Sequence, residues 1–515
     1  GIVLSFATVS LGGIGWDAVF EVNATTTFAS VESGQSLDEI RTIVPEQDVA
    51  RGLWILYLAR ILAFFGGASP DFGPDAVETY LLFGVASATV VVLGSFLVSV
   101  VVWLTTRSRL AAVLALALLF STPLWVGIAG VAYRDAPIAI GLTLVASGSS
   151  LLFTRQTDRR LTAFAFLLVA LGTLIAVGSR AGAIALVATL VALSMVPLLI
   201  PRWRRGQPVV ARIAAVLSGL AAGLFTAILV NPVARLDPVD WIVQSVFLSQ
   251  SNPTTMLVKV LSQDVMSDNL PPWYIPAYVF AQFPIATLAA LALGLMIIGA
   301  TAVHRARTRR PVGPTSDEPS LGITWPFVVQ GLFLPLLVTV AGSNIYDGLR
   351  HVLFLIPPLM VLTAMAVAFA SNDYLQAITA IVAGLAVLFG SWATIRWFPY
   401  SYAHLNPVAG LIKEPRIWEL DYWGLTAREG VTTLRDLGAA TVYVSPTANT
   451  SLPWGASEPL SDQSDRSSEG FGWYVFERWA ADLPPECRVE FEIRRDGHVL
   501  GRGGLCSPID ANLAE

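Results

Sequence analysis

Three polar residues stand directly before the apolar segment VLFLIPPLM in the second half of the chain: Asp347, Arg350 and His351. The planar guanidinium of an arginine binds two oxygens of a phosphate at once. A carboxylate placed within hydrogen-bond reach of a hydroxyl accepts its proton. Charged groups at the edge of a membrane-spanning helix are costly and tend to mark functional cavities. This short stretch is therefore the first candidate site.

Other acids and cations recur at similar positions. Asp17 and Glu21 are four residues apart and share one face if that segment is helical. Arg134 and Asp135 form an adjacent pair just before Pro137, which can begin a helix without losing a hydrogen bond. An Arg-Asp pair of this kind is either an anchor at the membrane surface or part of a site.

Cations and aromatic residues extend this set. Arg180 is the charged residue between two apolar segments, where it either serves a site or extends to lipid headgroups. Lys259 lies in a segment rich in aspartate, at 232–271. Trp273 and Tyr274 in the sequence PPWYIP form an aromatic entrance to the next helix, or belong to the aromatic belt of the membrane interface.

The composition predicts the elements that position these side chains. The chain has 515 residues, of which 54% are hydrophobic and 13% charged, and this balance is typical of a polytopic membrane protein. A membrane-spanning helix needs about 20 mostly apolar residues. Such runs occur at 79–105, 109–131, 136–154, 160–179, 181–201, 209–231, 273–301, 323–342, 351–371 and 374–395.

The beginning of the chain adds a further segment. GIVLSFATVSLGGIG is short and apolar, and we expect it to be the outer half of a first helix, with a signal-peptide remnant as the alternative. The total expected is therefore about eleven helices. The first outer loop, 14–78, contains a segment near 48–65 that is too short to span comfortably. It is expected to lie along the membrane interface, or to be a buried helix of a compact loop.

Arginines in alternate loops set the predicted orientation, because short cytoplasmic loops carry an excess of positive charge. The basic loops read TTRSR, TRQTDRR, PRWRRGQPVVAR and HRARTRR. If these basic loops are cytoplasmic, the loops between them, which carry the candidate site residues, and the chain after residue 396 lie outside the cytoplasm. Domain 1–395 is then the transmembrane part, and 396–515 is a small extracytoplasmic α/β domain.

The C-terminal segment alternates helical and strand patterns, with TAREGVTTLRDLG followed by ATVYVSP, GWYVFERW and RVEFEIRRDGHVLGRG. Both cysteines of the chain, Cys487 and Cys506, flank the last predicted hairpin. They form either a disulfide, as an oxidising compartment allows, or two buried thiols. Asp421 either contacts the site or caps the helix that begins near Thr426. We expect the domain to be structural rather than to bind acceptor or cover the site.

Cations and acids gathered on the outer face suit one reaction in particular. Cations hold a phosphate whose lipid tail lies among the helices, while a carboxylate accepts a proton from an attacking hydroxyl. The reaction indicated is the transfer of a sugar from a lipid phosphate. No phosphate-binding glycine loop, cluster of metal ligands or Ser-His-Asp arrangement stands out in the sequence, and no partner nucleic acid is expected.

The motifs YRDAPIA, LPPWYIPAYVFAQFP, YDGLRHVLFLIPP, PYSYAHLNPVAG and WELDYWGLTAREG resemble those of the GT-C superfamily of membrane glycosyltransferases. The resemblance is to the bacterial branch of dolichyl-phosphate-mannose protein mannosyltransferases and aminoarabinose transferases. It implies a polyprenyl-phosphate-linked sugar donor, a cell-envelope glycan, lipid or protein acceptor, inversion at the anomeric carbon, and a bacterial plasma membrane protein acting on the extracytoplasmic side.

The resemblance also implies roles for individual residues. Asp17 matches the catalytic base, although Ala18 replaces the second acid of many relatives, which leaves Glu21 as a substitute. Asp135 matches an acid near the acceptor or a divalent cation. Cations that the resemblance and the charge pattern assign to the donor phosphate are Arg350, His351, Lys259, Arg134 and Arg180, with Asp347 orienting Arg350.

Three other functions compete with this one. A polymerase or ligase of lipid-linked oligosaccharides would use the same face with a lipid diphosphate donor. A transporter would place charges near the bilayer midplane and break paired helices, whereas these charges gather at one surface. A non-catalytic scaffold would use 396–515 as a partner module.

Overall fold

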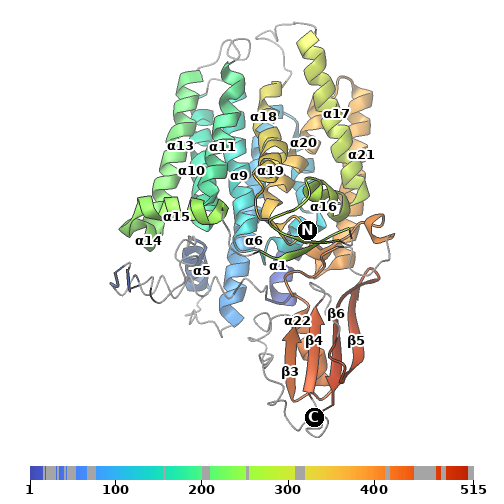
Figure 1. Ribbon diagram of the computed structural model, residues 1–515. Helices are drawn as coiled ribbons and strands as arrows, with labels where there is room; N and C mark the ends of the chain where they lie inside the picture. Colours follow the sequence, from blue (N-terminus) through green and yellow to red (C-terminus); the bar gives the residue numbers. More distant parts are fainter. Residues whose placement is uncertain are drawn as a thin grey trace.

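Helices, long and short, make up most of the described residues (Figure 1). The computed structural model describes residues 1–14, 18, 31, 34–36, 38–39, 42, 54–66, 77–154, 158–199, 209–250, 255–261, 263–307, 319–411, 418–445, 471–476 and 483–507. Asp17, Glu21 and most of the first outer loop lie outside these ranges.

Eight helical stretches of the described chain are long and apolar enough to cross a membrane. They are α6 (Val77–Thr106), α9 with η1 (Asp135–Ser150, Leu151–Phe153), α10 (Arg159–Ser179), α13 (Val209–Val230), α17 (Ile285–Arg307), the run η3, α18, η4 and α19 (Leu321–Thr324, Trp325–Val328, Val329–Phe333, Leu334–Val340), η5 with α20 (Arg350–Leu355, Ile356–Phe369) and α21 (Asp373–Trp397). The chain is a multi-pass membrane protein.

Shorter apolar helices fill the other predicted ranges. α1 (Ile2–Leu11), α7 (Arg109–Leu119) and α11 (Ala183–Met195) with η2 (Val196–Leu199) lie where spans were expected, so the total of eleven stays a prediction. α5 (Trp54–Phe65) falls in the range of the expected interfacial helix. It packs against α6 and α10, and its Trp54 Nε1 donates to Ser179 Oγ at 2.6 Å.

Prolines divide two of the predicted spans, at 273–301 and at 109–131. The prediction of a single helix in each of these ranges was therefore wrong. The first range consists of α16 (Tyr274–Gln282) and α17, separated at Phe283, which is extended before Pro284. The second consists of α7 and α8 (Pro123–Ile128). A proline has no N–H and disfavours helical geometry in the residue before it, so a helix ends there and a new one begins.

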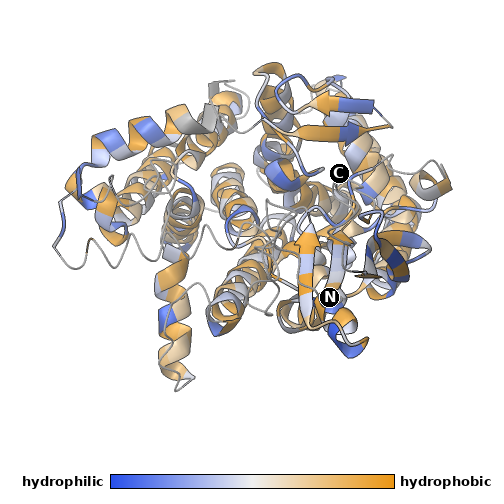
Figure 2. Cartoon of the chain, turned by 60° about the horizontal axis from the view of Figure 1, so that its bottom comes forward, coloured by the Kyte–Doolittle hydropathy of each residue, from blue (hydrophilic) through white to orange (hydrophobic). Residues whose placement is uncertain are grey.

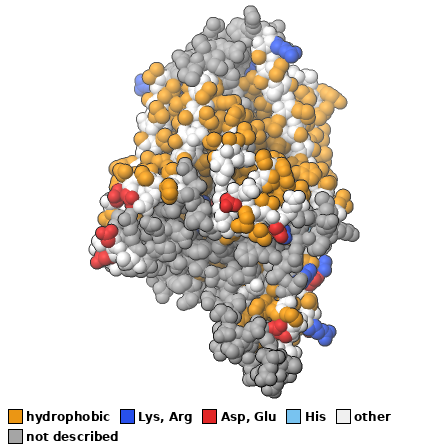
Figure 3. All heavy atoms as spheres, viewed as in Figure 1, with side chains coloured by type: hydrophobic (Ala, Val, Ile, Leu, Met, Phe, Trp, Pro, Cys, Tyr) orange, Lys and Arg blue, Asp and Glu red, His pale blue; other side chains and the backbone are white. Residues whose placement is uncertain are grey.

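On the face shown in Figure 3, apolar side chains cover most of the helical part, and most of the charged side chains lie near its ends and on the sheet. α9 and α20 form the centre, because the apolar window of α9 is 100% buried and that of the η5–α20 stretch is 94% buried. The outer-loop range 232–271 contains α14 (Pro232–Leu236), α15 (Pro238–Gln250) and the antiparallel pair β1 (Leu257–Val260) and β2 (Gln263–Met266).

The C-terminal part forms α22 (Ala427–Asp436) and four strands where the sequence patterns predict them. The strands form one sheet in the order β3-β4-β6-β5. The strands are β3 (Thr441–Ser445), β4 (Phe471–Phe476), β5 (Cys487–Arg495) and β6 (His498–Cys506). β3 is parallel to β4, and the other pairs are antiparallel. Cys487 and Cys506 face each other across β5 and β6 and form a disulfide, which confirms that expectation and is consistent with an extracytoplasmic location.

The sheet lies at one end of the bundle, and the basic end of α17 lies at the other (Figure 1). When the sheet end is turned forward, hydrophilic residues appear mainly in its loops and short elements, and the long helices behind them are mostly hydrophobic (Figure 2). This separation agrees with the orientation inferred from the basic loops.

Candidate functional site

Arg350 lies between two carboxylates. Its Nε donates to Asp135 Oδ2 at 3.0 Å, and its Nη1 donates to Asp347 Oδ2 at 2.8 Å. Arg350 is 4% exposed and Asp347 is fully buried. Asp135 is the first residue of α9 and Arg350 the first of η5, so two helix starts that are 215 residues apart in sequence meet here. Two of the predicted motifs therefore form one site.

A tight turn before η5 holds this geometry. Asp347 and Gly348 both have left-handed backbone conformations, with φ of 61° and 62°. The Arg350 N–H donates to the Asp347 carbonyl at 3.2 Å, which closes the turn. Gly348 N–H donates to Glu419 Oε2 at 3.3 Å. A side chain at Gly348 would also approach Tyr278 to 3.1 Å, so this position favours glycine both by conformation and by space.

A small pocket opens beside Arg350 and Asp135. It is lined by Ala18, Val131, Tyr133, Arg134, Asp135, Arg350 and Trp423. The guanidinium of Arg350 stacks on the indole of Trp423, with 4.6 Å between the guanidinium carbon and the ring centroid. Of the charged side chains that line this pocket, two are arginines and one is an aspartate, and the buried carboxylate of Asp347 pairs with Arg350 from outside the lining.

Arg180 lies close to the same cluster. Burial lowers the pKa of Arg180, and the neighbouring Arg134 cation lowers it further, whereas Asp135 and Tyr346 raise it. Arg180 follows the last residue of α10 directly. Arg180 thus lies near Arg134 and Asp135, which come from a different inter-helix segment.

The remaining predicted residues lie outside the pocket lining. The ammonium of Lys259 pairs with Asp264 across the β1–β2 turn. The His351 ring packs edge to face on Tyr346, with 4.4 Å between ring centroids. Trp273 is 41% exposed, whereas Tyr274 is 1% exposed and packs on Tyr278.

Asp17 and Glu21, the expected base and its substitute, lie outside the described residues. Ala18, the residue that follows Asp17, is described and lines the pocket. No group of three or more histidines, cysteines or acids placed to hold a metal ion occurs within the part of the chain that the structure describes.

Sequence reasoning missed Trp423 and Glu419 as site residues. Trp423 lines the pocket, and Glu419 is 2% exposed and binds the turn before η5. Both belong to the sequence WELDYWG, which follows the last long helix and whose dense aromatic residues were the available signal. Burial raises the pKa of the intervening Tyr422, and the charges of Asp347 and Arg350 act on it in opposite directions. Glu419 and Trp423 are therefore part of the site.

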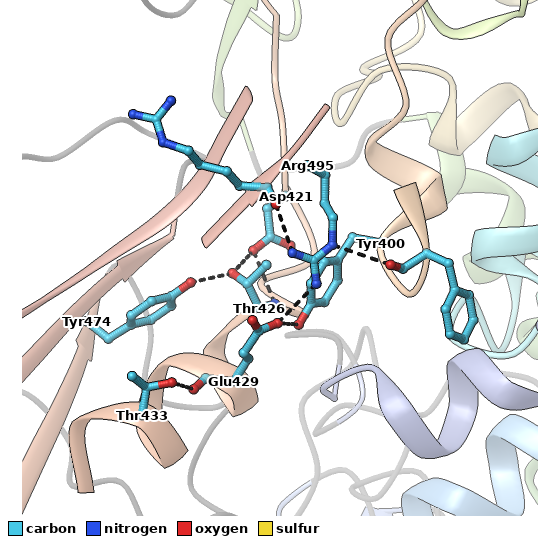
Figure 4. A network of polar contacts seen from close by, with 9 residues as sticks. Tyr400, Asp421, Thr426, Glu429, Thr433, Tyr474 and Arg495 are labelled. Atoms are coloured by element: carbon cyan, nitrogen blue, oxygen red, sulfur yellow. Dashed lines mark hydrogen bonds and ion pairs between the residues drawn. The ribbon is translucent and has the colours of Figure 1, made fainter. Parts of the chain in front are cut away.

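Asp421 connects that segment to the C-terminal sheet (Figure 4). Its carboxylate accepts hydrogen bonds from the Leu425 N–H at 2.9 Å, the Thr426 N–H at 3.3 Å and the hydroxyls of Tyr402 and Thr426. The Tyr474 hydroxyl on β4 in turn donates to Thr426 Oγ1 at 2.7 Å. Asp421 thus binds Leu425 and Thr426, the two residues directly before α22.

A second contact set reinforces this junction. Glu429 on α22 accepts from the Tyr400 hydroxyl at 2.7 Å and pairs with Arg495 Nη2 at 3.3 Å, and Arg495 also lies over the Tyr400 ring (Figure 4). The residues that follow α21 are therefore bound to α22 and β5. These contacts hold the segment that carries Trp423 between the helical bundle and the sheet.

No protein-family model and no curated protein matches this sequence. Among solved structures, the chain is similar to ArnT from Cupriavidus metallidurans bound to undecaprenyl phosphate, with 9% identity, a TM-score of 0.47 and coverage of 97% of this chain and 96% of that chain. The apo state of ArnT from the same organism gives 10% identity and a TM-score of 0.48, with the same coverage of 97% and 96%.

The archaeal oligosaccharyltransferase AglB from Archaeoglobus fulgidus, in complex with an inhibitory peptide and a dolichol-phosphate, is also similar. It has 12% identity and a TM-score of 0.40, covering 79% of this chain and 55% of that chain. At such identities these likenesses concern the fold alone.

Proposed function

We propose that this protein transfers a sugar from a polyprenyl-phosphate-linked donor to a glycan, lipid or protein acceptor of the cell envelope, on the extracytoplasmic face and with inversion at the anomeric carbon. One observation carries the proposal. Arg134, Arg350 and Asp135 line one pocket, and Arg350 is held there by two carboxylates. The pocket combines cations for a phosphate with an acid, as this reaction requires.

Arg350 is suited to the donor phosphate because its orientation is fixed before a ligand binds. Its Nε and Nη1 are engaged by Asp135 and Asp347, and its plane rests on Trp423. Groups that are already oriented lose little freedom when charge develops beside them, which is how preorganised sites stabilise a departing anion. Arg134 and Arg180 add positive charge from neighbouring segments, and His351 and Lys259, which do not line the pocket, complete the predicted set.

Asp17 is assigned the role of general base. The acceptor hydroxyl attacks the anomeric carbon while Asp17 takes its proton, and the bond to the phosphate oxygen breaks as positive charge spreads over the sugar ring. The departing phosphate carries away the bonding electrons and is stabilised by the arginines. Ala18 lines the pocket, which supports assigning this role to the adjacent acid. Asp135 has the second acidic role, near the acceptor or near a divalent cation.

Replacement of Asp17 by Asn tests the mechanism in the purified full-length protein. Loss of a general base typically costs about 100-fold or more in rate, so transfer from a polyprenyl-phosphate sugar should fall by at least that factor. Asp38→Asn is a control in the same outer loop, because Asp38 is exposed. Full activity of Asp17→Asn would contradict the mechanism.

Two further measurements separate the alternative functions. A requirement for a lipid diphosphate donor in place of a monophosphate would favour a polymerase or ligase. Solute uptake by reconstituted vesicles, with no sugar transfer, would favour a transporter.

A further inference from the structure

Trp423 has a hydrogen-bond donor that no described residue uses. Its side chain is 3% exposed, and its indole Nε1–H is buried without an acceptor among the described residues. A buried N–H that loses its partner costs roughly 1–3 kcal/mol. Such a group in a native structure calls for an explanation, and a bound ligand is one of the few available.

The position of Trp423 points to that ligand. The residue lines the pocket beside Arg134, Asp135 and Arg350, and its ring face is already occupied by the Arg350 guanidinium. The face of the indole therefore supports the cation, and the N–H at its edge remains for another group. An indole N–H donates and never accepts, so its partner must carry an acceptor such as a phosphate oxygen.

The segment around Trp423 is held rigidly enough to place this donor. Asp421, two residues earlier, binds Leu425 and Thr426, and Thr426 is bound by Tyr474 of the sheet. Contacts on both sides of Trp423 thus fix the backbone that carries it. A ligand that meets a fixed donor loses less conformational entropy on binding than one that must order it.

We propose that the Trp423 indole N–H donates a hydrogen bond to a phosphate oxygen of the lipid-linked ligand, next to the oxygens held by arginine. This assignment rests on the proposed function, because that function supplies the phosphate. It gives the segment after the last long helix a direct part in substrate binding, in addition to its structural role.

Trp418 provides a matched control within the same segment. Its indole N–H is also buried without an acceptor among the described residues, and its side chain is 7% exposed. However, its ring packs edge to face on Tyr278, and it does not line the pocket. The same substitution at Trp418 and Trp423 therefore separates loss of the pocket donor from loss of ring volume.

Binding of a polyprenyl phosphate to the full-length protein in nanodiscs tests the proposal, with polyprenol and inorganic phosphate as parallel probes. A hydrogen bond to a charged acceptor contributes about 1.5–3 kcal/mol, and 1.4 kcal/mol corresponds to a tenfold change. Trp423→Phe should therefore weaken polyprenyl phosphate binding about tenfold or more, and Trp418→Phe by less than about twofold. Polyprenol, which has no phosphate, should bind the wild type and Trp423→Phe equally.

The inorganic phosphate probe distinguishes the source of the recognised group. Free phosphate that competes with the lipid in the wild type, and competes less well in Trp423→Phe, supports recognition of the phosphate itself. Incorporation of benzothienylalanine at position 423 keeps the shape of the ring and removes only the N–H, so it should reproduce the loss in binding even if Trp423→Phe disturbs packing.

Three results would overturn the proposal: unchanged polyprenyl phosphate affinity in the benzothienylalanine variant, equal losses at positions 418 and 423, or a loss of polyprenol binding as large as that of polyprenyl phosphate. Failure of the wild type to bind polyprenyl phosphate is a separate result, because it would remove the proposed function itself.

Discussion

Asp347 Oδ2 accepts a hydrogen bond from Arg350 Nη1 at 2.8 Å, and this carboxylate is fully buried while the arginine is 4% exposed. A buried ion pair contributes to stability only when both charges are well partnered, and removal of one partner leaves the other charge uncompensated. Asp135 supplies the second partner of Arg350. The arrangement fixes the Arg350 guanidinium at the pocket, as the proposed binding of a donor phosphate requires.

Asp347→Asn should weaken binding of a polyprenyl phosphate by roughly 3- to 10-fold. An amide preserves the shape of the side chain but no longer holds the guanidinium by charge, so Arg350 is less well oriented. Nanodisc binding measurements check this expectation, with Asp436→Asn as a control because Asp436 is exposed on α22. Unchanged affinity in Asp347→Asn would refute the orienting role of Asp347.

Gly348→Ala should destabilise the protein by about 1–2 kcal/mol, because a left-handed conformation at φ 62° penalises a Cβ. The added carbon would also lie 3.1 Å from the Tyr278 ring. Thermal unfolding in detergent measures the change. Gly384→Ala in α21 is the comparison, since nothing lies within 4 Å of its Cβ position and alanine favours a helix. Equal melting temperatures for the two variants would contradict this account of the turn.

Asp421 should make stability depend on pH. Burial raises the pKa of Asp421 from 3.8 to about 7, although its hydrogen bonds to Thr426 and Tyr402 lower it. Between these two values the folded state binds more protons than the unfolded state, so the contribution of Asp421 to stability is full below about pH 3.8 and is lost as pH rises to about 7.

Asp421→Asn removes this titration, so its melting temperature should fall less than that of the wild type between pH 5 and pH 7.5. A difference of about 2 °C or more is expected for a change on the order of 1 kcal/mol. Asp436→Asn serves as the reference, because an exposed carboxylate should leave the wild-type slope in place. Parallel pH profiles for the wild type and Asp421→Asn would contradict the assignment.

Cys487 and Cys506 should react with a membrane-impermeant maleimide in intact cells only after reduction, because they form a disulfide and are the two cysteines of the chain. Two labels per molecule are expected, and the Cys487→Ser/Cys506→Ser variant should take up none. Closing a loop between residues 19 apart contributes about 3 kcal/mol, so this variant should also be cleaved faster by protease in the sheet. Labelling without reduction, or labelling only after lysis, would contradict the disulfide or the extracytoplasmic location.

The positions of most of the long helices could be predicted from the sequence, because a membrane-spanning helix needs a continuous apolar run and such a run is visible within one segment. Their number could not, since eight stretches of the described residues are long enough to span and the expected total was eleven. The positions of the β5–β6 hairpin and of α22 could also be predicted, since their patterns are those of two strands joined by a turn and of an amphipathic helix. Pro123 and Pro284 were visible signals for a helix break. The apolar residues on both sides of each proline nevertheless favoured one continuous helix in the prediction.

The sequence by itself determined the candidate acids and cations and the face of the membrane on which they were expected. Only the tertiary structure decided which of them meet: Asp135 and Asp347 bind Arg350, whereas Lys259 pairs with Asp264. The tertiary structure likewise placed Trp423 at the site, where its ring packs on Arg350. The reason is physical, since apolar periodicity and charge placement act within one segment, while contacts between residues far apart in sequence depend on how the helices pack.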